Sequence, residues 1–138
     1  MNTNLTLAPG LTEEIIRHAR TGLPHEACAL LAGHGNLAER FIPMVNTLAS
    51  ETEYEMDPAQ LAATFRELRV SGEDLVAIVH SHPRGLAQPS PRDLERAWYP
   101  EAVYIIVSLA DREHPEVQGF RIAGTPAQAI EIELHAIV

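Results

Sequence analysis

Apolar residues follow a helical spacing at the start of the chain and an extended spacing soon after it. The pattern of residues 11–19 repeats every three to four positions and stops at Gly22, which predicts an amphipathic helix. Residues 27–32 and 38–45 are short apolar segments on either side of a turn-like His-Gly-Asn sequence. We therefore expect a helix followed by a β-hairpin.

The middle of the chain combines a polar segment, a helix and a strongly apolar strand. Residues 46–56 are polar and irregular, which predicts an exposed loop. Asp57 stands as an N-cap before Pro58, and the helical apolar pattern that follows ends at Gly72. Residues 74–79 are almost continuously aliphatic, which is typical of a central strand covered on both faces.

The last third of the chain predicts one more helix and three strands. The helix begins at Ser90 and carries Ala97 and Trp98 on its apolar side, and we expect both Trp98 and Tyr99 to pack against the sheet. Strands are predicted at 103–109 and 117–123, and the alternating tail predicts a third, half-buried strand. The predicted inward-facing residues of the tail are Ile130, Ile132, Leu134 and Ala136.

This order of elements predicts an α/β or α+β fold, in which helices pack on a mixed β-sheet. The length of 138 residues fits one core, so we expect a single domain over residues 1–138. Hydrophobic residues make up 46% and charged residues 21%, as in ordinary folded proteins. The sequence carries no signal for the oligomeric state.

The net charge and the cysteine content indicate which classes of partner and which cellular compartment to expect. Ten basic against 19 acidic residues give a formal net charge of −9, and such a surface repels phosphate backbones and anionic lipids. The longest apolar runs fall far short of the roughly 20 residues that span a bilayer. Neither nucleic acid nor a membrane is an expected partner. The single cysteine, Cys28, cannot form an internal disulfide, which favours the reducing cytoplasm.

Two histidines stand at the end of the predicted central strand. Residues two apart in an extended chain point the same way, so His80 and His82 project toward one small volume. A loop and one helical turn can bring Asp93 back to the strand end. Two imidazoles and one carboxylate are typical of a tetrahedral Zn²⁺ site with one position left for water. Zn²⁺ lowers the pKa of its water to about 7, so amide hydrolysis becomes feasible once a general base is present.

With these residues in place, the chain resembles the JAMM (MPN+) zinc metalloproteases, a family of JAB1/MPN domains. The family pattern is matched by Glu26, by the sequence His80-Ser81-His82-Pro83, and by Ser90 with Asp93 three residues later. Short standalone prokaryotic members are most similar. The resemblance implies a cytidine-deaminase-like fold with a mixed, curved β-sheet flanked by helices. Ala29 departs from the glycine that relatives commonly carry at that position.

The resemblance also implies a role for each matched residue. His80, His82 and Asp93 would hold one Zn²⁺ per chain. Glu26 would take a proton from the water and deliver it to the leaving amine, and Ser90 would hydrogen-bond the oxyanion. The implied substrate is a peptide or isopeptide bond at the C-terminal tail of a ubiquitin-like or sulfur-carrier protein. The polar loop could clamp such a tail by strand addition.

Other interpretations remain open at this stage. Ser90 and Asp93 also form an ordinary capping box, and Asp93 can both cap and ligate if one oxygen takes each role. Cys28 reads as a small buried hydrophobe, with a fourth zinc ligand or a redox switch as alternatives. A non-catalytic scaffold or interaction module of the same fold is the competing function. Zinc-dependent nucleobase deamination needs a cysteine pair, which this chain lacks.

Overall fold

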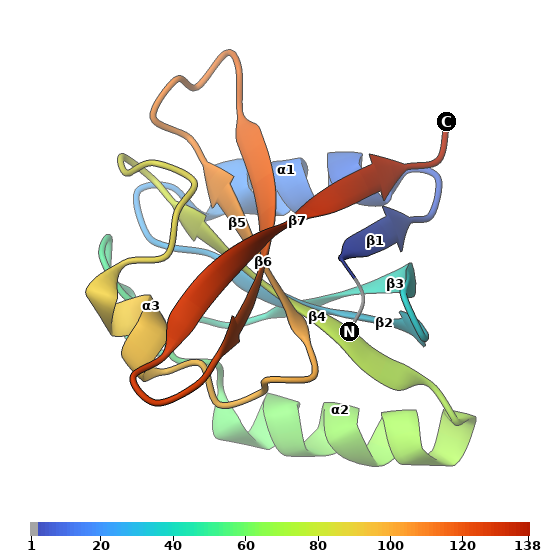
Figure 1. Ribbon diagram of the computed structural model, residues 1–138. Helices are drawn as coiled ribbons and strands as arrows, with labels where there is room; N and C mark the ends of the chain where they lie inside the picture. The colour runs from blue at the N-terminus through green and yellow to red at the C-terminus, as the bar shows by residue number, and fades with distance from the viewer. Residues whose placement is uncertain (1–2) are drawn as a thin grey trace.

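Seven strands form one strongly curved mixed sheet that closes on itself in the computed structural model, which describes residues 3–138 (Figure 1). The strands are β1 (Asn4–Leu7), β2 (Cys28–His34), β3 (Leu37–Met44), β4 (Asp74–His82), β5 (Val103–Ser108), β6 (Glu116–Ala123) and β7 (Gln128–Ala136). Their order is β1-β3-β2-β4-β5-β6-β7, and β7 pairs with β1 to close the barrel. The pairs β1–β3, β1–β7 and β4–β5 are parallel and the others antiparallel. The predicted mixed, curved sheet is confirmed.

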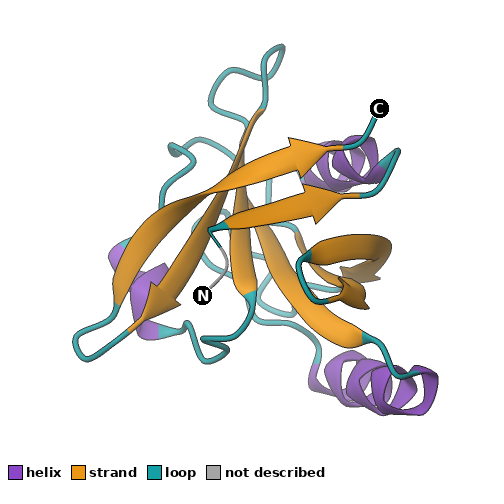
Figure 2. Cartoon of the chain, turned by 45° about the vertical axis from the view of Figure 1, so that its right-hand side comes forward, coloured by secondary structure: helices purple, strands orange, loops and turns teal. Residues whose placement is uncertain are grey.

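Three helices flank the sheet in the described residues. They are α1 (Leu11–Gly22), α2 (Pro58–Ser71) and α3 (Pro91–Glu95). In Figure 1, α1 lies above the sheet and α2 below it, with α3 at the left, and Figure 2 shows the same three helices around the curved strands. α2 begins and ends as predicted, because Asp57 accepts a hydrogen bond from the Gln60 N–H and Gly72 ends the helix at a φ of 76°.

The two faces of the sheet carry separate apolar cores. One core packs α1, through Leu11, Ile15 and Ala19, against residues of the sheet that include Ala29 and Val79. The other contains Cys28, Leu30, Ile78 and Ile106, with side chains of α2 and of the α3 region against it. Since β4 is covered on both sides, its aliphatic run is buried as predicted.

Strand β1 was not predicted from the sequence. It has only four residues, of which Leu5 and Leu7 are buried and Asn4 and Thr6 are half-buried. Two alternations are too few to stand out as a pattern. The strand forms because β3 and β7, distant in sequence, offer pairing partners on both sides.

The prediction for the tail strand is partly wrong. Ile132 and Leu134 point inward, but Ile130 is 67% exposed and Ala136 is also exposed. Ile130 lies opposite Arg121 near the turn between β6 and β7, and neither residue belongs to one of the two cores, whereas the neighbouring Ile122 is buried in one of them. Alternation predicts which residues share a face, whereas burial also depends on what packs against that face.

The third helix is shorter than predicted. It ends at Glu95, so Ala97 and Trp98 lie outside it, and Trp98 is 71% exposed instead of packed on the sheet. Pro100 disfavours the helical conformation at Tyr99, which helps to end the helix early. Tyr99 is half-buried against Phe65 of α2, with ring centroids 5.9 Å apart.

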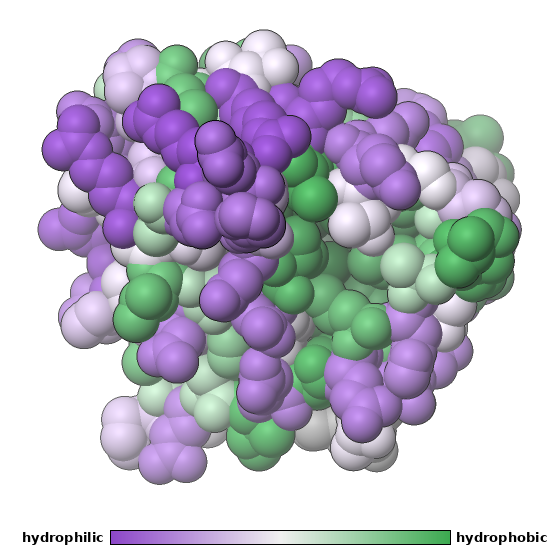
Figure 3. Space-filling model, turned by 90° about the horizontal axis from the view of Figure 1, so that it is seen from above, coloured by the Kyte–Doolittle hydropathy of each residue, from purple (hydrophilic) through white to green (hydrophobic). Residues whose placement is uncertain are grey.

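The face seen from above carries many polar side chains, and apolar side chains line a hollow near its centre and also reach the surface at its right-hand edge (Figure 3). Within residues 3–138, no helix has the length and apolar character needed to cross a bilayer.

Candidate metal centre

His80 and His82 lie at the C-terminal end of β4 with their side chains on the same face. β4 runs between β2 and β5, and its ladders pair His80 with Cys28 and His82 with Ser108. The two histidines are only 2% and 9% exposed. Pro83, which has no N–H to donate, follows the last strand residue. The strand therefore delivers both imidazoles to one place, as the spacing predicted.

Asp93 lies in the first turn of α3 and points its carboxylate at both histidines. Its Oδ2 is 3.2 Å from Nε2 of His80 and 3.0 Å from Nε2 of His82, and the two Nε2 atoms are 3.1 Å apart. A tetrahedral site with bonds of about 2.0–2.1 Å separates its ligand atoms by about 3.3 Å. These three side chains form the group in residues 3–138 that can hold a metal ion.

The hydrogen bond of the His82 ring fixes which of its nitrogens faces the group. Nδ1 of His82 lies 2.7 Å from the carbonyl oxygen of Leu86, and because a carbonyl only accepts, Nδ1 carries the proton. In the neutral form of this ring, the lone pair of Nε2 points toward His80 and the Asp93 carboxylate. Electron-rich atoms that face each other at 3 Å repel one another unless a cation lies between them. The donor set fits a metal cation.

The pKa values reflect this close grouping. Burial alone would raise the pKa of Asp93, but hydrogen bonds with His80 and His82 outweigh burial and lower it. Burial lowers the pKa of His80. Burial also acts to lower the pKa of His82, but the bonds to Asp93 and to the Leu86 carbonyl reverse this and leave it raised. Asp93 is therefore a carboxylate and His80 a neutral imidazole at neutral pH.

Ser90 is the N-cap of α3 and holds Asp93 in place. Its Oγ accepts from the Asp93 N–H at 3.1 Å, and Asp93 Oδ2 accepts from the Ser90 N–H at 2.9 Å. The capping and histidine-facing roles coexist in Asp93, but on one oxygen instead of one role for each oxygen, since Oδ2 both accepts from Ser90 and faces the two Nε2 atoms. The capping box thus sets the direction of the carboxylate.

Glu26 lies two residues before the first residue of β2, in a buried position beside the histidines. It is 4% exposed, and its Oε1 has no hydrogen-bond partner among the described residues. Burial raises the pKa of Glu26 to about 8, a shift that the charge of His82 reduces and that of Asp93 increases. A carboxyl group with such a pKa can exchange a proton near neutral pH.

Residues 46–56, which we call the flap, are more ordered than the predicted exposed loop. Asn46 and Met56 form an isolated bridge at the base of the flap. Tyr54 is half-buried and stacks on the His80 ring. Glu53 forms ion pairs with Arg92 and Arg96. The loop prediction missed these contacts. The sequence feature that pointed to them was Tyr54, an aromatic residue in an otherwise polar segment.

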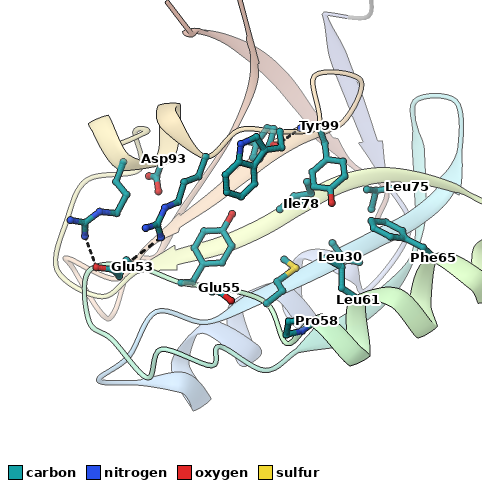
Figure 4. Close-up of a pocket in the computed structure, with 16 residues that line it drawn as sticks. Leu30, Glu53, Glu55, Pro58, Leu61, Phe65, Leu75, Ile78, Asp93 and Tyr99 are labelled. Atoms are coloured by element: carbon teal, nitrogen blue, oxygen red, sulfur yellow. Dashed lines mark hydrogen bonds and ion pairs between the residues drawn. The ribbon is translucent and has the colours of Figure 1, made fainter.

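An apolar cavity of about 510 Å³ extends from the metal centre toward α2 (Figure 4). Asp93 lies at one end and Phe65 at the other, with the flap along one side. Trp98, predicted to be a packing residue, lines this cavity. The lining residues are Leu30, Glu53, Tyr54, Glu55, Met56, Pro58, Leu61, Phe65, Leu75, Ile78, Arg92, Asp93, Arg96, Trp98, Tyr99 and Tyr104.

Cys28 is fully buried close to the centre and behaves as a small apolar residue. Its Sγ points to the Met44 carbonyl at 3.9 Å, and burial raises its thiol pKa to about 12. A thiol with this pKa stays protonated, so it is a poor metal ligand and a poor nucleophile.

A family model agrees with this site and fold. Residues 9–123 match the model described as prokaryotic homologs of the JAB domain. The chain belongs to this family. The family predicted from the JAMM motif is therefore confirmed. The expectation of a hydrolase is confirmed as well, by relatives at 36% and 34% identity that are named as a peptidase and a desampylase.

Several named prokaryotic proteins are similar in sequence. The CysO-cysteine peptidase of Mycobacterium tuberculosis is 36% identical over 120 residues, which cover 86% of this chain and 82% of the relative. The desampylase of Haloferax volcanii is 34% identical and covers 78% and 82%. A probable TtuB-protein conjugate cleaving protease of Thermus thermophilus is 43% identical and covers 64% and 60%.

Solved structures support the fold. A protein of Desulfitobacterium hafniense superimposes with a TM-score of 0.82 at 34% identity, covering 97% of this chain and 94% of its own. A JAB1/MPN domain protein of Archaeoglobus fulgidus gives 0.64 at 21% identity, covering 99% and 100%. A structure described as a metalloprotease-like zinc site in the proteasome and signalosome gives 0.58 at 21%, with the same coverage. The last two are evidence for the fold alone.

Proposed function

We propose that this JAB-family chain is a zinc-dependent peptidase or isopeptidase that acts on the C-terminal tail of a ubiquitin-like or sulfur-carrier protein. The observation that carries the proposal is the convergence of the His80, His82 and Asp93 ligand atoms beside the buried carboxyl of Glu26. The names of three relatives describe enzymes that release a product from, or cleave a conjugate of, such small proteins.

One Zn²⁺ per chain fits the three ligand atoms. His80 and His82 would contribute Nε2, and Asp93 would contribute Oδ2, whose direction Ser90 fixes. A bound Zn²⁺ supplies Lewis acidity, which activates water and polarises the scissile carbonyl. Three protein ligands would leave one coordination position for water or substrate, as in catalytic zinc sites generally.

Glu26 is the proposed general base and acid. Burial raises the pKa of this carboxyl in the metal-free site, and the charge of a bound Zn²⁺ would lower it again. The carboxylate form would then accept a proton and pass it to the leaving amine. The Ser90 hydroxyl accepts from the Asp93 N–H, so its own proton remains available to donate. We assign this proton to the developing oxyanion of the substrate carbonyl.

The cavity is the proposed path for the substrate tail. It starts at Asp93 and is lined mainly by apolar and aromatic side chains, so it favours uncharged tail residues. Arginines pair with two of the three flap glutamates, Glu51 and Glu53, which limits the negative charge at its entrance. We also propose that the substrate tail binds the flap as an added β-strand.

The test is hydrolysis of defined conjugates followed by intact mass. A small carrier protein ending in Gly-Gly is joined to cysteine in one sample and to a lysine side chain of a second protein in another. The zinc-loaded protein is expected to restore the free Gly-Gly carboxylate, and Glu26→Gln is the matched control. If the zinc-loaded protein cleaves neither conjugate, the result would favour a non-catalytic scaffold of the same fold.

A further inference from the structure

Asn46, at the base of the flap, uses its whole side-chain amide in hydrogen bonds. Its Nδ2 donates to the carbonyl oxygen of Glu26 at 3.0 Å and to that of Glu53 at 3.1 Å. Its Oδ1 accepts from the N–H groups of Leu48 and Glu55, each at 3.1 Å. An asparagine amide has two N–H donors and two acceptor lone pairs, so all four positions are filled.

The backbone of Glu26 depends on the flap. Glu26 precedes β2 and so lies outside the strand ladders. Its N–H donates to the Ser50 carbonyl at 2.7 Å, and its carbonyl accepts from Asn46 Nδ2. Both backbone polar groups of the proposed general base are therefore bonded to residues of the flap.

The flap is in turn attached to the helix that carries Asp93. Glu53, whose carbonyl is bonded to Asn46, places its carboxylate 2.7 Å from Arg92 and 3.3 Å from Arg96. Arg92 directly precedes Asp93 in α3. A chain of contacts thus runs from Glu26 through Asn46 and Glu53 to α3.

We propose that Asn46 is a positioning residue for the hydrolysis described above. Its amide N–H groups hold the backbone of Glu26, and hence its carboxyl, at a fixed place relative to His80, His82 and Asp93. A misplacement of about 1 Å in a reacting group costs up to about 100-fold in rate. The inference rests on the proposed function, because it concerns the same reaction.

The side-chain oxygen and the side-chain NH2 group of Asn46 make different contacts, and only the NH2 group reaches Glu26. Changing the NH2 group alone therefore distinguishes a positioning role from a role in the turn. The bond from the Leu48 N–H to Oδ1 is an Asx-turn contact, which an aspartate makes equally well. Asn46→Asp keeps the acceptor contacts to the flap and loses the N–H donors to Glu26 and Glu53. A residue that served only the turn would tolerate this change.

The experiment measures kcat, KM and zinc content of Asn46→Asp and Asn46→Ala on a conjugate that the wild-type protein cleaves. We expect kcat to fall about 10- to 100-fold in both variants, as for other outer-shell partners of metal sites. KM and the one zinc per chain should be unchanged, and a cobalt-substituted variant should keep the wild-type absorption spectrum. Asn36→Asp is the matched control, because Asn36 is exposed in the turn between β2 and β3, where its Nδ2 donates to Oδ1 of Asn4 at 2.8 Å.

A double-mutant cycle tests whether Asn46 acts through Glu26. In a Glu26→Gln background, Asn46→Asp is expected to cause no further loss of the residual rate. Wild-type kcat in Asn46→Asp, an additive loss in the double mutant, or failure of Asn46→Asp to fold would each overturn the assignment. An inactive wild-type protein would instead contradict the proposed function itself.

Discussion

The ring of Tyr54 stacks on the ring of His80, with centroids 4.7 Å apart and planes inclined by 26°. Tyr54 belongs to the flap, whereas His80 lies near the end of β4. The contact covers one face of a proposed metal ligand with a side chain from a segment that the sequence marks as a loop. The flap is thus part of the wall of the candidate metal centre.

The stacking predicts an effect on metal affinity. Aromatic ring pairs contribute about 0.5–1.5 kcal/mol beyond their buried area, so Tyr54→Ala should weaken zinc binding roughly three- to tenfold. Tyr54→Phe keeps the stack and should bind zinc like the wild type. Competition titration with a chromogenic chelator measures both values. Equal affinity in all three proteins would show that the stack does not support His80.

Glu26 is expected to act on the reaction without holding the metal. Glu26→Gln should keep one zinc per chain and reduce kcat by about 100-fold or more, because the amide cannot take up the proton. Elemental analysis and steady-state kinetics on the same preparation check the two parts. Loss of zinc together with activity would make Glu26 a ligand instead of a base.

The raised pKa of Glu26 also predicts how the metal-free protein responds to pH. The folded-state pKa of about 8 lies above the ordinary value of 4.5, so the folded state binds more protons than the unfolded state between these values. The free energy of unfolding should therefore fall as pH rises from about 5 to 8. Urea denaturation in the presence of a chelator measures it.

The Glu26→Gln protein is the control for this pH dependence, since His80 and His82 are titratable as well. The difference between wild type and Glu26→Gln isolates the contribution of Glu26. As the pH rises from 5 to 8, the free energy of unfolding of the wild type should fall steadily relative to that of Glu26→Gln. A constant difference from pH 5 to 8 would show that the carboxyl is not protonated in the folded protein.

Trp98 provides a test of the cavity as the substrate path. The side chain is 71% exposed and lines the cavity, so its removal should leave the fold intact. Trp98→Ala is expected to raise KM several-fold with little change in kcat or melting temperature, because only binding area is lost. Val70→Ala, on an exposed position of α2 outside the cavity lining, is the matched control. An unchanged KM in Trp98→Ala would place the tail elsewhere.

Much of the site follows from local sequence rules. The period of two along a strand places His80 and His82 on one side, and the capping pattern at Ser90 places Asp93 in a first helical turn. The motif resemblance supplied Glu26, which as a single acidic residue carries no local signal. These inferences depend on short stretches of chain, where spacing determines geometry.

What the sequence did not predict depends on contacts between distant segments. The Tyr54 stack, the bond from Asn46 to Glu26 and the exposure of Ile130 each depend on how separate elements pack. Hydrophobic patterning assigned Trp98 to the core because it carries no information on where the helix would end. The same limit applies to the short strand β1, which depends on β3 and β7.

The most direct test of the account is a zinc-edge anomalous difference map from crystals of the zinc-loaded protein. We expect one strong peak about 2.0–2.1 Å from Nε2 of His80, Nε2 of His82 and a carboxylate oxygen of Asp93, with no protein atom at the fourth position. A peak elsewhere, or a fourth protein ligand that closes the site, would contradict the proposed zinc hydrolase.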